Sequence, residues 1–387
     1  MVEIGFHHRI GGRHDDRDLG AESGDIGHGG RGASSSGPAS GRAGSRTIAG
    51  TPAPRQPGGL AEKPPMHYHS RRIDRLRGPE GAPSTGGGPM SDGIVFIDGE
   101  YMAPEDATMS IFDVGFVWGD CVYDVTSTWN GWFFMLDEHL ERFQRSCEGF
   151  RLENPYSFEE MRRICAECVE RTGLTNTYVK MQVSRGVPPP GVRDPRGLKP
   201  IVLVYAVPYV WIWGEEKCRD GATLYVSGVE RVSSKAIDQR FKNYNRADLV
   251  QARLEAYDND CDDAILAGPD GFLSEGPGFN VFVVKDGKVA SPDYNVLEGI
   301  TRRSVREICE REGIPYELRK VRPEELEEAS EVFTSTTAGG VMPITGVNGK
   351  TIGNGHAGIV TSRIQSIYWS ERAAGWHGVK PADILAN

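Results

Sequence analysis

The sequence has no uninterrupted apolar run of about 18 residues or more, so it predicts no helix that crosses a membrane. It also lacks an excess of basic residues, because 44 Lys and Arg stand against 54 Asp and Glu, and the formal net charge is -10. A domain that binds nucleic acid carries a basic surface. We therefore expect small-molecule partners, no nucleic acid and no membrane.

The seven cysteines do not form the pattern of a disulfide framework. They are scattered and odd in number, and no secretory leader precedes them, which favours a reducing, cytoplasmic location. Cys165 and Cys168 form a C-x-x-C motif, but it lies in a stretch with helical spacing and has no second pair nearby. Because free cysteine is among the most buried residue types, we interpret both as core residues and expect no metal site.

The composition changes near residue 92. Residues 1–91 are rich in Gly, Pro, Ser and Arg. Such a stretch buries too little apolar surface to offset the entropy of ordering it, so we predict a disordered extension.

From Ile94 onward, short β-like runs alternate with helical segments. Asp98-Gly99 and Asn130-Gly131 each lie between apolar runs, which is a strong signal for a β-hairpin. The alternation predicts two α+β domains with β-rich cores and flanking helices. We place a small N-terminal domain at 92–212, a large C-terminal domain at 213–374, and a tail at 375–387.

Two residues have chemistry that a buried site can use. Lys242 precedes a predicted helix in F-K-N-Y-N, and its apolar and aromatic surroundings can disfavour the ammonium form and make the amine a better nucleophile. Glu275, 33 residues later (242 to 275), precedes a Gly-Pro-Gly turn that feeds a strand, so its carboxyl group can face a pocket and protonate a heteroaromatic nitrogen. A solvated lysine and a solvated glutamate are the simpler interpretations.

Two other segments can bind an anion. Ile300 and Thr301 follow Gly299 at the start of a predicted helix, where free N–H groups and the helix dipole attract phosphate. Thr301 is equally suited to cap that helix. Thr336 and Thr337 lie in the small-residue turn S-T-T-A-G-G, which is also compatible with ordinary loop chemistry.

Five motifs occur in an order that resembles the class IV aminotransferases, namely H-L-x-R, F-K-N-Y-N, S-E-G-P-G-F-N-V-F, L-E-G-I-T-R and T-T-A-G-G. That group includes branched-chain aminotransferases, D-amino-acid aminotransferases, (R)-selective amine transaminases and aminodeoxychorismate lyases. The resemblance covers about residues 94 to 372. It implies an α/β (α+β) fold of the two-domain fold type IV, D-amino-acid aminotransferase-like, with pyridoxal 5'-phosphate (PLP) at the domain interface. It also implies a homodimer whose partner loops close the site.

The resemblance also implies roles for single residues. Lys242 would carry PLP covalently, and its freed amine would move a proton between Cα and C4′. Glu275 would keep the pyridine nitrogen protonated. Tyr123 would lie beside the cofactor. Arg142 would bind the phosphate, together with Ile300, Thr301 and Thr337 and with Thr336 adjacent.

The substrate pocket matches no subgroup fully. Y-A-V-P-Y-V-W-I is most similar to (R)-selective amine transaminases, but Arg246 stands where those enzymes usually have tryptophan. Lys180 stands where branched-chain enzymes often carry arginine, so it keeps the charge without the bidentate fork. Arg193 resembles a mobile arginine that binds a keto-acid carboxylate in some relatives. Together they indicate a cationic wall for an amino or 2-oxo acid, although each of them alone can equally be a solvated residue.

We therefore expect a ping-pong transaminase that moves an amino group from an amino acid or amine to a 2-oxo acid, in the manner of branched-chain aminotransferases. The alternatives are an (R)-selective amine:pyruvate transaminase and an aminodeoxychorismate lyase, which would release pyruvate. A binding module without activity is the remaining class, and it would lack the cofactor chromophore.

Overall fold

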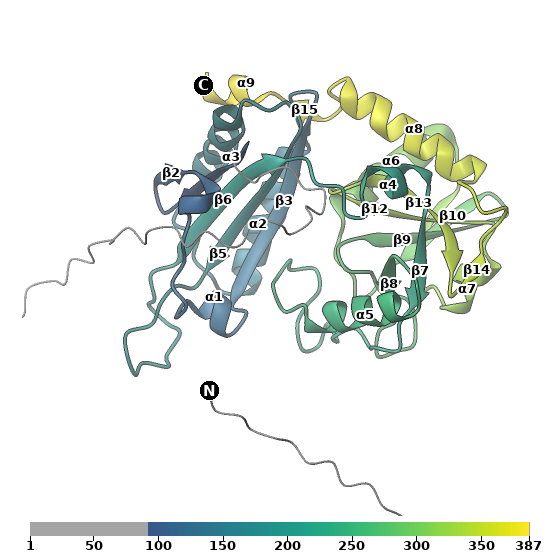
Figure 1. Cartoon of the computed structure of the whole chain (residues 1–387), viewed down its shortest axis with the longest axis horizontal. Coiled ribbons are helices and arrows are strands. Elements are labelled where there is room, and N and C mark those ends of the chain that lie inside the picture. Colours follow the sequence, from purple (N-terminus) through teal and green to yellow (C-terminus); the bar gives the residue numbers. More distant parts are fainter. Residues whose placement is uncertain (1–91, 387) are drawn as a thin grey trace, which may run out of the picture. The chain divides into compact units, whose positions relative to one another are not determined.

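The structure, a computed structural model, describes residues 92–386 (Figure 1). The predicted disordered extension at 1–91 lies outside the described residues, as does Asn387. Strand β1 begins at Ile94, where the sequence predicts the first β-like run. Among the described residues, no helix has the length and apolar character needed to cross a membrane.

The first of two sheets is antiparallel throughout, with the strand order β15-β4-β3-β5-β6-β1-β2. Its strands are β1 (Ile94–Ile97), β2 (Glu100–Met102), β3 (Cys121–Trp129), β4 (Trp132–Phe134), β5 (Thr177–Ser184), β6 (Ile201–Pro208) and β15 (Gly378–Val379).

The second sheet is mixed, with the strand order β11-β10-β9-β12-β13-β7-β8 and with β14 paired to β13 outside that path. The pairs β10–β11, β13–β7 and β7–β8 are parallel. Its strands are β7 (Ala222–Val226), β8 (Asp263–Ile265), β9 (Asn280–Lys285), β10 (Lys288–Pro292), β11 (Tyr316–Arg319), β12 (Glu331–Thr336), β13 (Gly340–Val347) and β14 (Lys350–Thr351).

Helices flank both sheets, so the fold belongs to the mixed α/β (α+β) class. They are η2 (Pro104–Asp106), α1 (Val114–Val117), α2 (Leu136–Gly149), α3 (Phe158–Thr172), α4 (Glu215–Asp220), α5 (Ala247–Asp258), α6 (Ile300–Glu312), α7 (Glu324–Glu328), α8 (Ile359–Ala373) and α9 (Pro381–Leu385).

Local sequence signals explain several element boundaries. Both hairpins that the sequence predicts are present: Asp98-Gly99 joins β1 to β2 and Asn130-Gly131 joins β3 to β4, and all four residues have positive φ. Helix α3 begins with a capping box in which Ser157 and Glu160 satisfy each other's backbone N–H groups, and Gly173 ends the helix in the left-handed conformation.

Each sheet is covered by apolar side chains. In the first sheet, Cys165 and Cys168 of α3 are fully buried free thiols in the core beneath α2 and α3, which confirms our interpretation of the C-x-x-C motif. In the second sheet, Val281 of β9 packs in one apolar cluster and its neighbour Phe282 in another, the latter shared with α6 and α8. Alternation of this kind shows that the second sheet is buried on both faces.

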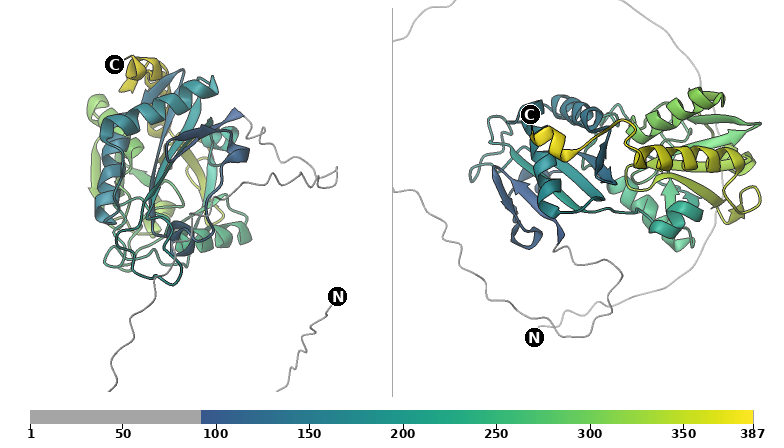
Figure 2. Two further views of the ribbon diagram at one scale, coloured as in Figure 1. Left: turned by 90° about the vertical axis from the view of Figure 1, so that its left-hand side faces the viewer. Right: turned by 90° about the horizontal axis from the view of Figure 1, so that it is seen from above.

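The C-terminal segment returns to the first sheet. Gly378 and Val379 pair with Phe134 and Phe133 of β4, and α9 packs against α3 (Figure 2). The chain thus leaves the first sheet after β6, builds the second sheet, and closes on the first. Segments that lie far apart in the sequence are in this way brought to one site.

Candidate active site

A cavity of about 350 Å³ is lined by residues of both sheets and of the segments that connect them. Most of the lining comes from β3 and β5, from residues 210 and 212 after β6, and from residues 239–249, which lead into α5. The rest includes residues 275–280 up to the start of β9, the start of α6, and residues 335–338 at the end of β12. The ends of distant elements therefore meet around one space, which is where ligand sites are usually built.

Backbone pairing with β3 places Lys242 in this cavity. The Lys242 carbonyl accepts a hydrogen bond from the Tyr123 N–H at 3.0 Å, and Asn243 forms a β-bridge with Val122. The Lys242 N–H donates to Ser146 Oγ of α2 at 3.0 Å. The Lys242 Nζ then lies 4.6 Å from the centre of the Tyr123 ring. The segment before α5 thus behaves as an extra strand, which fixes the direction of the lysine side chain.

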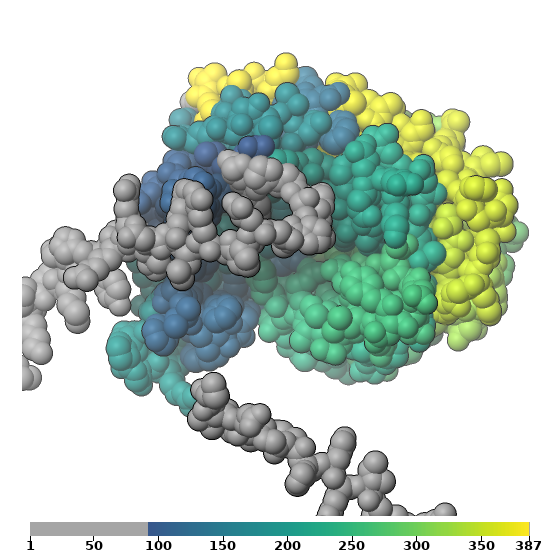
Figure 3. Space-filling model, viewed as in Figure 1, coloured from purple at the N-terminus to yellow at the C-terminus, as the bar shows by residue number. Residues whose placement is uncertain are grey.

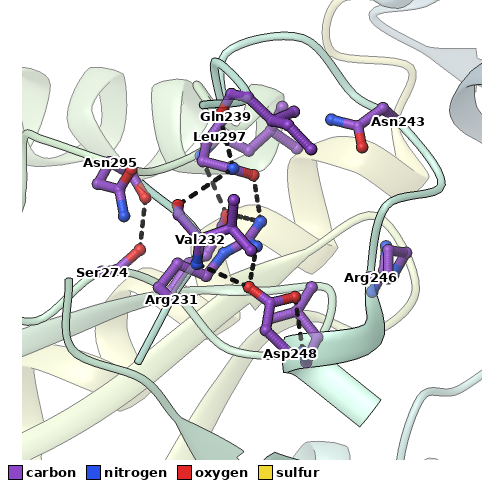
Figure 4. A network of polar contacts seen from close by, with 12 residues as sticks. Arg231, Val232, Gln239, Asn243, Arg246, Asp248, Ser274, Asn295 and Leu297 are labelled. Atoms are coloured by element: carbon purple, nitrogen blue, oxygen red, sulfur yellow. Dashed lines mark hydrogen bonds and ion pairs between the residues drawn. The ribbon is translucent and has the colours of Figure 1, made fainter. Parts of the chain in front are cut away.

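Glu275 is held at the cavity by two donors. Its Oε1 accepts from Arg231 Nη2 and its Oε2 accepts from the Leu297 N–H, both at 3.0 Å, and the residue is only 7% exposed. Arg231 also donates to Asp248 Oδ2 at 2.5 Å and to the amide oxygen of Gln239 (Figure 4). Burial lowers the pKa of Arg231, but Glu275 and Asp248 together raise it above its ordinary value. The Glu275 carboxylate therefore faces a permanent cation.

At another part of the cavity, helix α6 begins without a side-chain cap. Its N-cap residue is Gly299, and Ile300 and Thr301 line the cavity in the first turn, where the free N–H groups of a helix point outward. A side chain at position 299 has no room, because a Cβ there would lie 2.0 Å from Asn280 Oδ1. This helix has 13 residues, so its dipole and first N–H groups favour an anion.

Arg142 of α2 lies beside that helix start. Its Nη1 donates to the Glu298 carbonyl at 3.0 Å, and its Nε and Nη2 donate to the two carboxylate oxygens of Asp124 at 2.7 and 2.8 Å. A guanidinium has five N–H donors. Three of the five are used in these bonds, and the remaining two are available to a ligand in the cavity that Arg142 lines.

Asp124 in turn is saturated with donors. Besides Arg142, it accepts from His139 Nδ1 at 2.8 Å and from the Val125 N–H at 2.7 Å, and it is fully buried. Burial alone would raise the pKa of Asp124, but Arg142 and His139 hold it well below its usual range. Burial also lowers the pKa of His139. The carboxylate is therefore charged at neutral pH and fixes the direction of the Arg142 side chain.

A cationic wall faces the cavity around Tyr123. Lys180 Nζ lies 4.7 Å from the ring centres of Tyr123 and Tyr244, and Arg246 Nη1 donates to the Tyr123 hydroxyl. Within residues 92–386, neither Lys180 nor Arg246 nor Lys242 forms an ion pair with a carboxylate. Burial would raise the pKa of Tyr123, but these three cations together lower it. Burial and the neighbouring cations lower the pKa of Lys180. The lowered pKa of Lys180 reflects repulsion among cations that lie close together, and a bound anion would relieve this repulsion.

The donor set fits PLP. A phosphate suits the uncapped start of α6 and the two unused N–H groups of Arg142, an aldehyde suits the amine of Lys242, and a pyridine nitrogen suits the carboxylate of Glu275. In addition, Ser335 Oγ lines the cavity, is buried and has no hydrogen-bond partner within the described part of the chain. Buried polar atoms are rarely left unpaired, so this hydroxyl fits a site that is completed by a ligand.

Nine residues that the sequence marks as site candidates line this one cavity. They are Tyr123, Arg142, Lys180, Lys242, Glu275, Ile300, Thr301, Thr336 and Thr337. The tenth, Arg193, lies exposed on the loop between β5 and β6 and does not line the cavity. Its proposed contact with a substrate carboxylate stays a prediction, as do the roles of the other nine.

Sequence reasoning missed Arg231, Asp124 and Ser335. Arg231 lies 44 residues before Glu275, and no local motif connects the two. Asp124 directly follows Tyr123 in a strand of fully buried residues, and a charged residue at such a position was a usable signal, since buried charges are paired. Ser335 immediately precedes the Thr336-Thr337 pair. The residues next to Ser335 in β12 did not mark it as a site residue.

The family model for amino-transferase class IV matches residues 121–347. A putative branched-chain-amino-acid aminotransferase of Methanocaldococcus jannaschii is 30% identical over 292 residues, which cover 75% of this chain and 99% of that protein. A D-alanine aminotransferase of Staphylococcus epidermidis is 32% identical over 274 residues, which cover 70% of this chain and 95% of that protein.

Solved structures agree with these relatives. The branched-chain amino acid aminotransferase of Escherichia coli superposes with a TM-score of 0.70 at 27% identity, over 73% of this chain and 95% of that one. The T.th. enzyme of the same name, solved with pyridoxamine 5'-phosphate, superposes with a TM-score of 0.69 at 29% identity, over 74% and 98%. The resemblance seen in the motifs is thereby confirmed, and with it the two-sheet fold type IV. The chain belongs to the class IV aminotransferases and is an aminotransferase.

Proposed function

We propose that the chain binds PLP in this cavity through Lys242 and transfers an amino group between an amino acid and a 2-oxo acid. When bound, PLP withdraws electrons from the carbon that carries the amino group. Arg142, Thr301 and Thr337 would bind the phosphate, and Glu275, held by Arg231, would hold the ring nitrogen. The freed amine of Lys242 would take a proton from the α carbon of the donor and return one to the acceptor.

The observation that carries the substrate class is the cationic wall. Lys180 and Arg246 face the cavity beside Tyr123 without a carboxylate partner in the described part of the chain. A substrate carboxylate would neutralise this charge, whereas an amine such as (R)-1-phenylethylamine would leave it uncompensated. Pyruvate would neutralise the wall in the second half-reaction only, so the wall favours an amino acid over an amine as the donor.

The rest of the lining supports an apolar side chain on the donor. Val125, Val210, Ile212, Leu249 and Phe279 line the same cavity. A hydrophobic wall recognises a branched aliphatic group through burial of its surface. We therefore propose a branched-chain amino acid as donor.

Reduction with borohydride tests the cofactor site. We expect that protein incubated with PLP and then reduced yields a single pyridoxyl peptide, modified at Lys242. The Lys242→Ala variant should form no adduct and catalyse no transamination, while its far-ultraviolet circular dichroism and thermal midpoint stay close to those of the native protein. An adduct at another lysine, or turnover by this variant, would contradict the proposal.

Half-reactions distinguish the donors. Leucine should convert the bound cofactor faster than D-alanine does, and (R)-1-phenylethylamine should convert it slowest, when each is followed through the visible absorbance of the protein. A reversed order between leucine and D-alanine would assign the activity of the D-alanine relatives instead. Release of pyruvate from 4-amino-4-deoxychorismate would identify a lyase.

We further propose a homodimer. The segment around α1 exposes large apolar side chains, including Ile111 at 69%, Phe112 at 67% and Phe116 at 78%; it belongs to the face seen in Figure 3. Monomeric proteins rarely expose a contiguous patch of this kind, so a second copy of the chain is the partner that we propose for it.

Seven free, buried cysteines support a cytoplasmic location. The domain boundaries at 92–212 and 213–374 also remain part of this proposal.

A further inference from the structure

Arg372 of α8 is a buried cation that has no carboxylate partner among residues 92–386. It is 1% exposed, its Nη2 donates to Ser127 Oγ at 2.7 Å, and its Nη1 donates to the Tyr368 hydroxyl at 3.2 Å. Its Nε has no hydrogen-bond partner among the described residues. Buried charges are normally paired, because removing an ion from water is costly. This arginine does not line the cavity, so the proposed reaction does not account for it.

Aromatic rings surround this guanidinium in place of a carboxylate. The carbon at its centre lies 5.2 to 5.9 Å from the centres of five rings, and the negative faces of such rings attract a cation. We call this group the aromatic box, which consists of Trp129, Phe134, Tyr209, Tyr368 and Trp369.

The aromatic box joins three parts of the molecule. Trp129 and Phe134 come from β3 and β4 of the first sheet, Tyr209 from the segment 209–214 that follows β6, and Trp369 from α8, which packs on β13 of the second sheet (Figure 1). The segment 209–214 is the connection between the two sheets, and we call it the linker. The buried cation thus lies where the linker meets both sheets.

Two hydrogen bonds connect the linker with the turn after β12. The Tyr209 hydroxyl donates to the Thr337 carbonyl at 2.7 Å, and the Ile212 N–H donates to the Ala338 carbonyl at 2.9 Å. The box also contacts that turn directly, since a Cβ at Gly340 would lie 2.8 Å from the Trp369 ring and the φ of Gly340 is +68°. Only glycine fits both the space and the backbone conformation at this position.

Both connected segments line the cavity. Val210 and Ile212 of the linker form part of its apolar lining, and residues 335–338 form the wall that they contact. We infer that Arg372 is a positioning residue: through the aromatic box it fixes the linker against the turn after β12, and so sets the apolar wall that receives the side chain of the substrate. The effect on substrates rests on the proposed function, whereas the effect on the linker does not.

The inference predicts an effect on substrate affinity rather than on the cofactor or the chemical step. The turn that carries Thr337 is independently held by the pairing of β12 with β13, in which Thr336 lies opposite Gly340. Loss of the cation should therefore loosen the linker and leave the phosphate end of the cavity in place. The residues that move the proton, with Lys242 first among them, lie on other segments.

Arg372→Met is the variant that tests this. Methionine has a similar length and removes the buried charge without leaving an unpaired carboxylate, so the fold should survive. We expect the KM for leucine to rise about tenfold, with kcat and the half-saturation by PLP within about twofold of native values. Amide hydrogen exchange of the apoprotein should quicken in the peptide that spans 209–214 and not in the β12–β13 peptide.

Two further variants keep the test decisive. Tyr209→Phe keeps the ring in the box and removes the hydroxyl that bonds to the Thr337 carbonyl and interacts with Arg372. It should shift the KM and the linker exchange in the same direction without a change in buried charge. Arg171→Met is the matched control, because Arg171 also stacks on a ring, 4.0 Å from the centre of Tyr101, and this ring does not belong to the aromatic box. It should leave all of these quantities unchanged.

Unchanged linker exchange and unchanged KM in both Arg372→Met and Tyr209→Phe would overturn the inference. An equal loss in kcat and thermal midpoint with no selective change in KM would also overturn it, because that pattern indicates a purely structural role. Absence of a pyridoxyl adduct at Lys242 in the native protein would refute the proposed function instead, and the exchange experiment would still decide whether Arg372 fixes the linker.

Discussion

Replacing Arg142 with alanine should damage the protein in two separable ways. Arg142 donates twice to Asp124, which is fully buried, so the variant leaves a buried carboxylate with only His139 and one backbone N–H. Breaking a buried pair by removing one partner costs about 3–5 kcal/mol. The same variant loses the two remaining N–H groups of Arg142, which we propose as phosphate donors because the residue lines the cavity. One charge-assisted hydrogen bond is worth about 1.5–3 kcal/mol.

These two losses are measured by different assays. Urea denaturation of the apoprotein should report the loss of about 3–5 kcal/mol of unfolding free energy. Half-saturation by PLP should require about 10- to 150-fold more cofactor, which is the same 1.5–3 kcal/mol expressed as an affinity. Activity with PLP in large excess should recover in the fraction of the protein that remains folded.

A double variant separates the two effects. Asp124→Asn combined with Arg142→Gln replaces the charged pair with two neutral amides, so no unpaired charge is left in the core. Its unfolding free energy should recover most of the loss seen with Arg142→Ala, while its PLP half-saturation stays raised. If the double variant regains native affinity for PLP, Arg142 is not the phosphate ligand. If Arg142→Ala is as stable as the double variant, the pair with Asp124 does not contribute as the geometry indicates.

Three other predictions follow from the same contacts. The pKa of Asp124 is lowered in the folded state, so its contribution to stability is complete above its unfolded pKa of about 4 and is lost as the pH falls towards the folded value. The difference in unfolding free energy between the native protein and Asp124→Asn, measured by urea denaturation, should therefore be constant from pH 5 to 8 and should shrink below about pH 4. Lys180→Met should raise the KM for leucine about tenfold or more and leave the KM for (R)-1-phenylethylamine unchanged, because only the amino acid has a carboxylate for the cationic wall. Lys285→Met, at an exposed ion pair, is the control. Equal effects of Lys180→Met on both substrates would contradict the role of Lys180. Phe116→Asp should convert the dimer to a monomer in size-exclusion chromatography with light scattering, and a native mass that is already monomeric would refute the homodimer.

The sequence by itself determined the local elements and the chemistry of the family. The Asp98-Gly99 and Asn130-Gly131 hairpins form because these residue pairs adopt positive φ at low cost, which is a property of a few neighbouring residues. The order of five short motifs identified the class IV aminotransferases. Each motif consists of neighbouring residues, and the order of the motifs along the chain does not depend on the fold. Nine of the ten candidate residues line one cavity, and seven of these nine lie in the five motifs.

Only the tertiary structure decided which distant groups meet. Arg231 reaches Glu275 across 44 residues, and Arg372 reaches Ser127 across 245, through contacts that no local pattern encodes. Arg193 was selected from its loop motif, but its position depends on how that loop packs, and here it lies outside the cavity. The partners of buried charges depend on how distant segments pack, because the low dielectric of the interior strengthens such pairs only after the chain has folded.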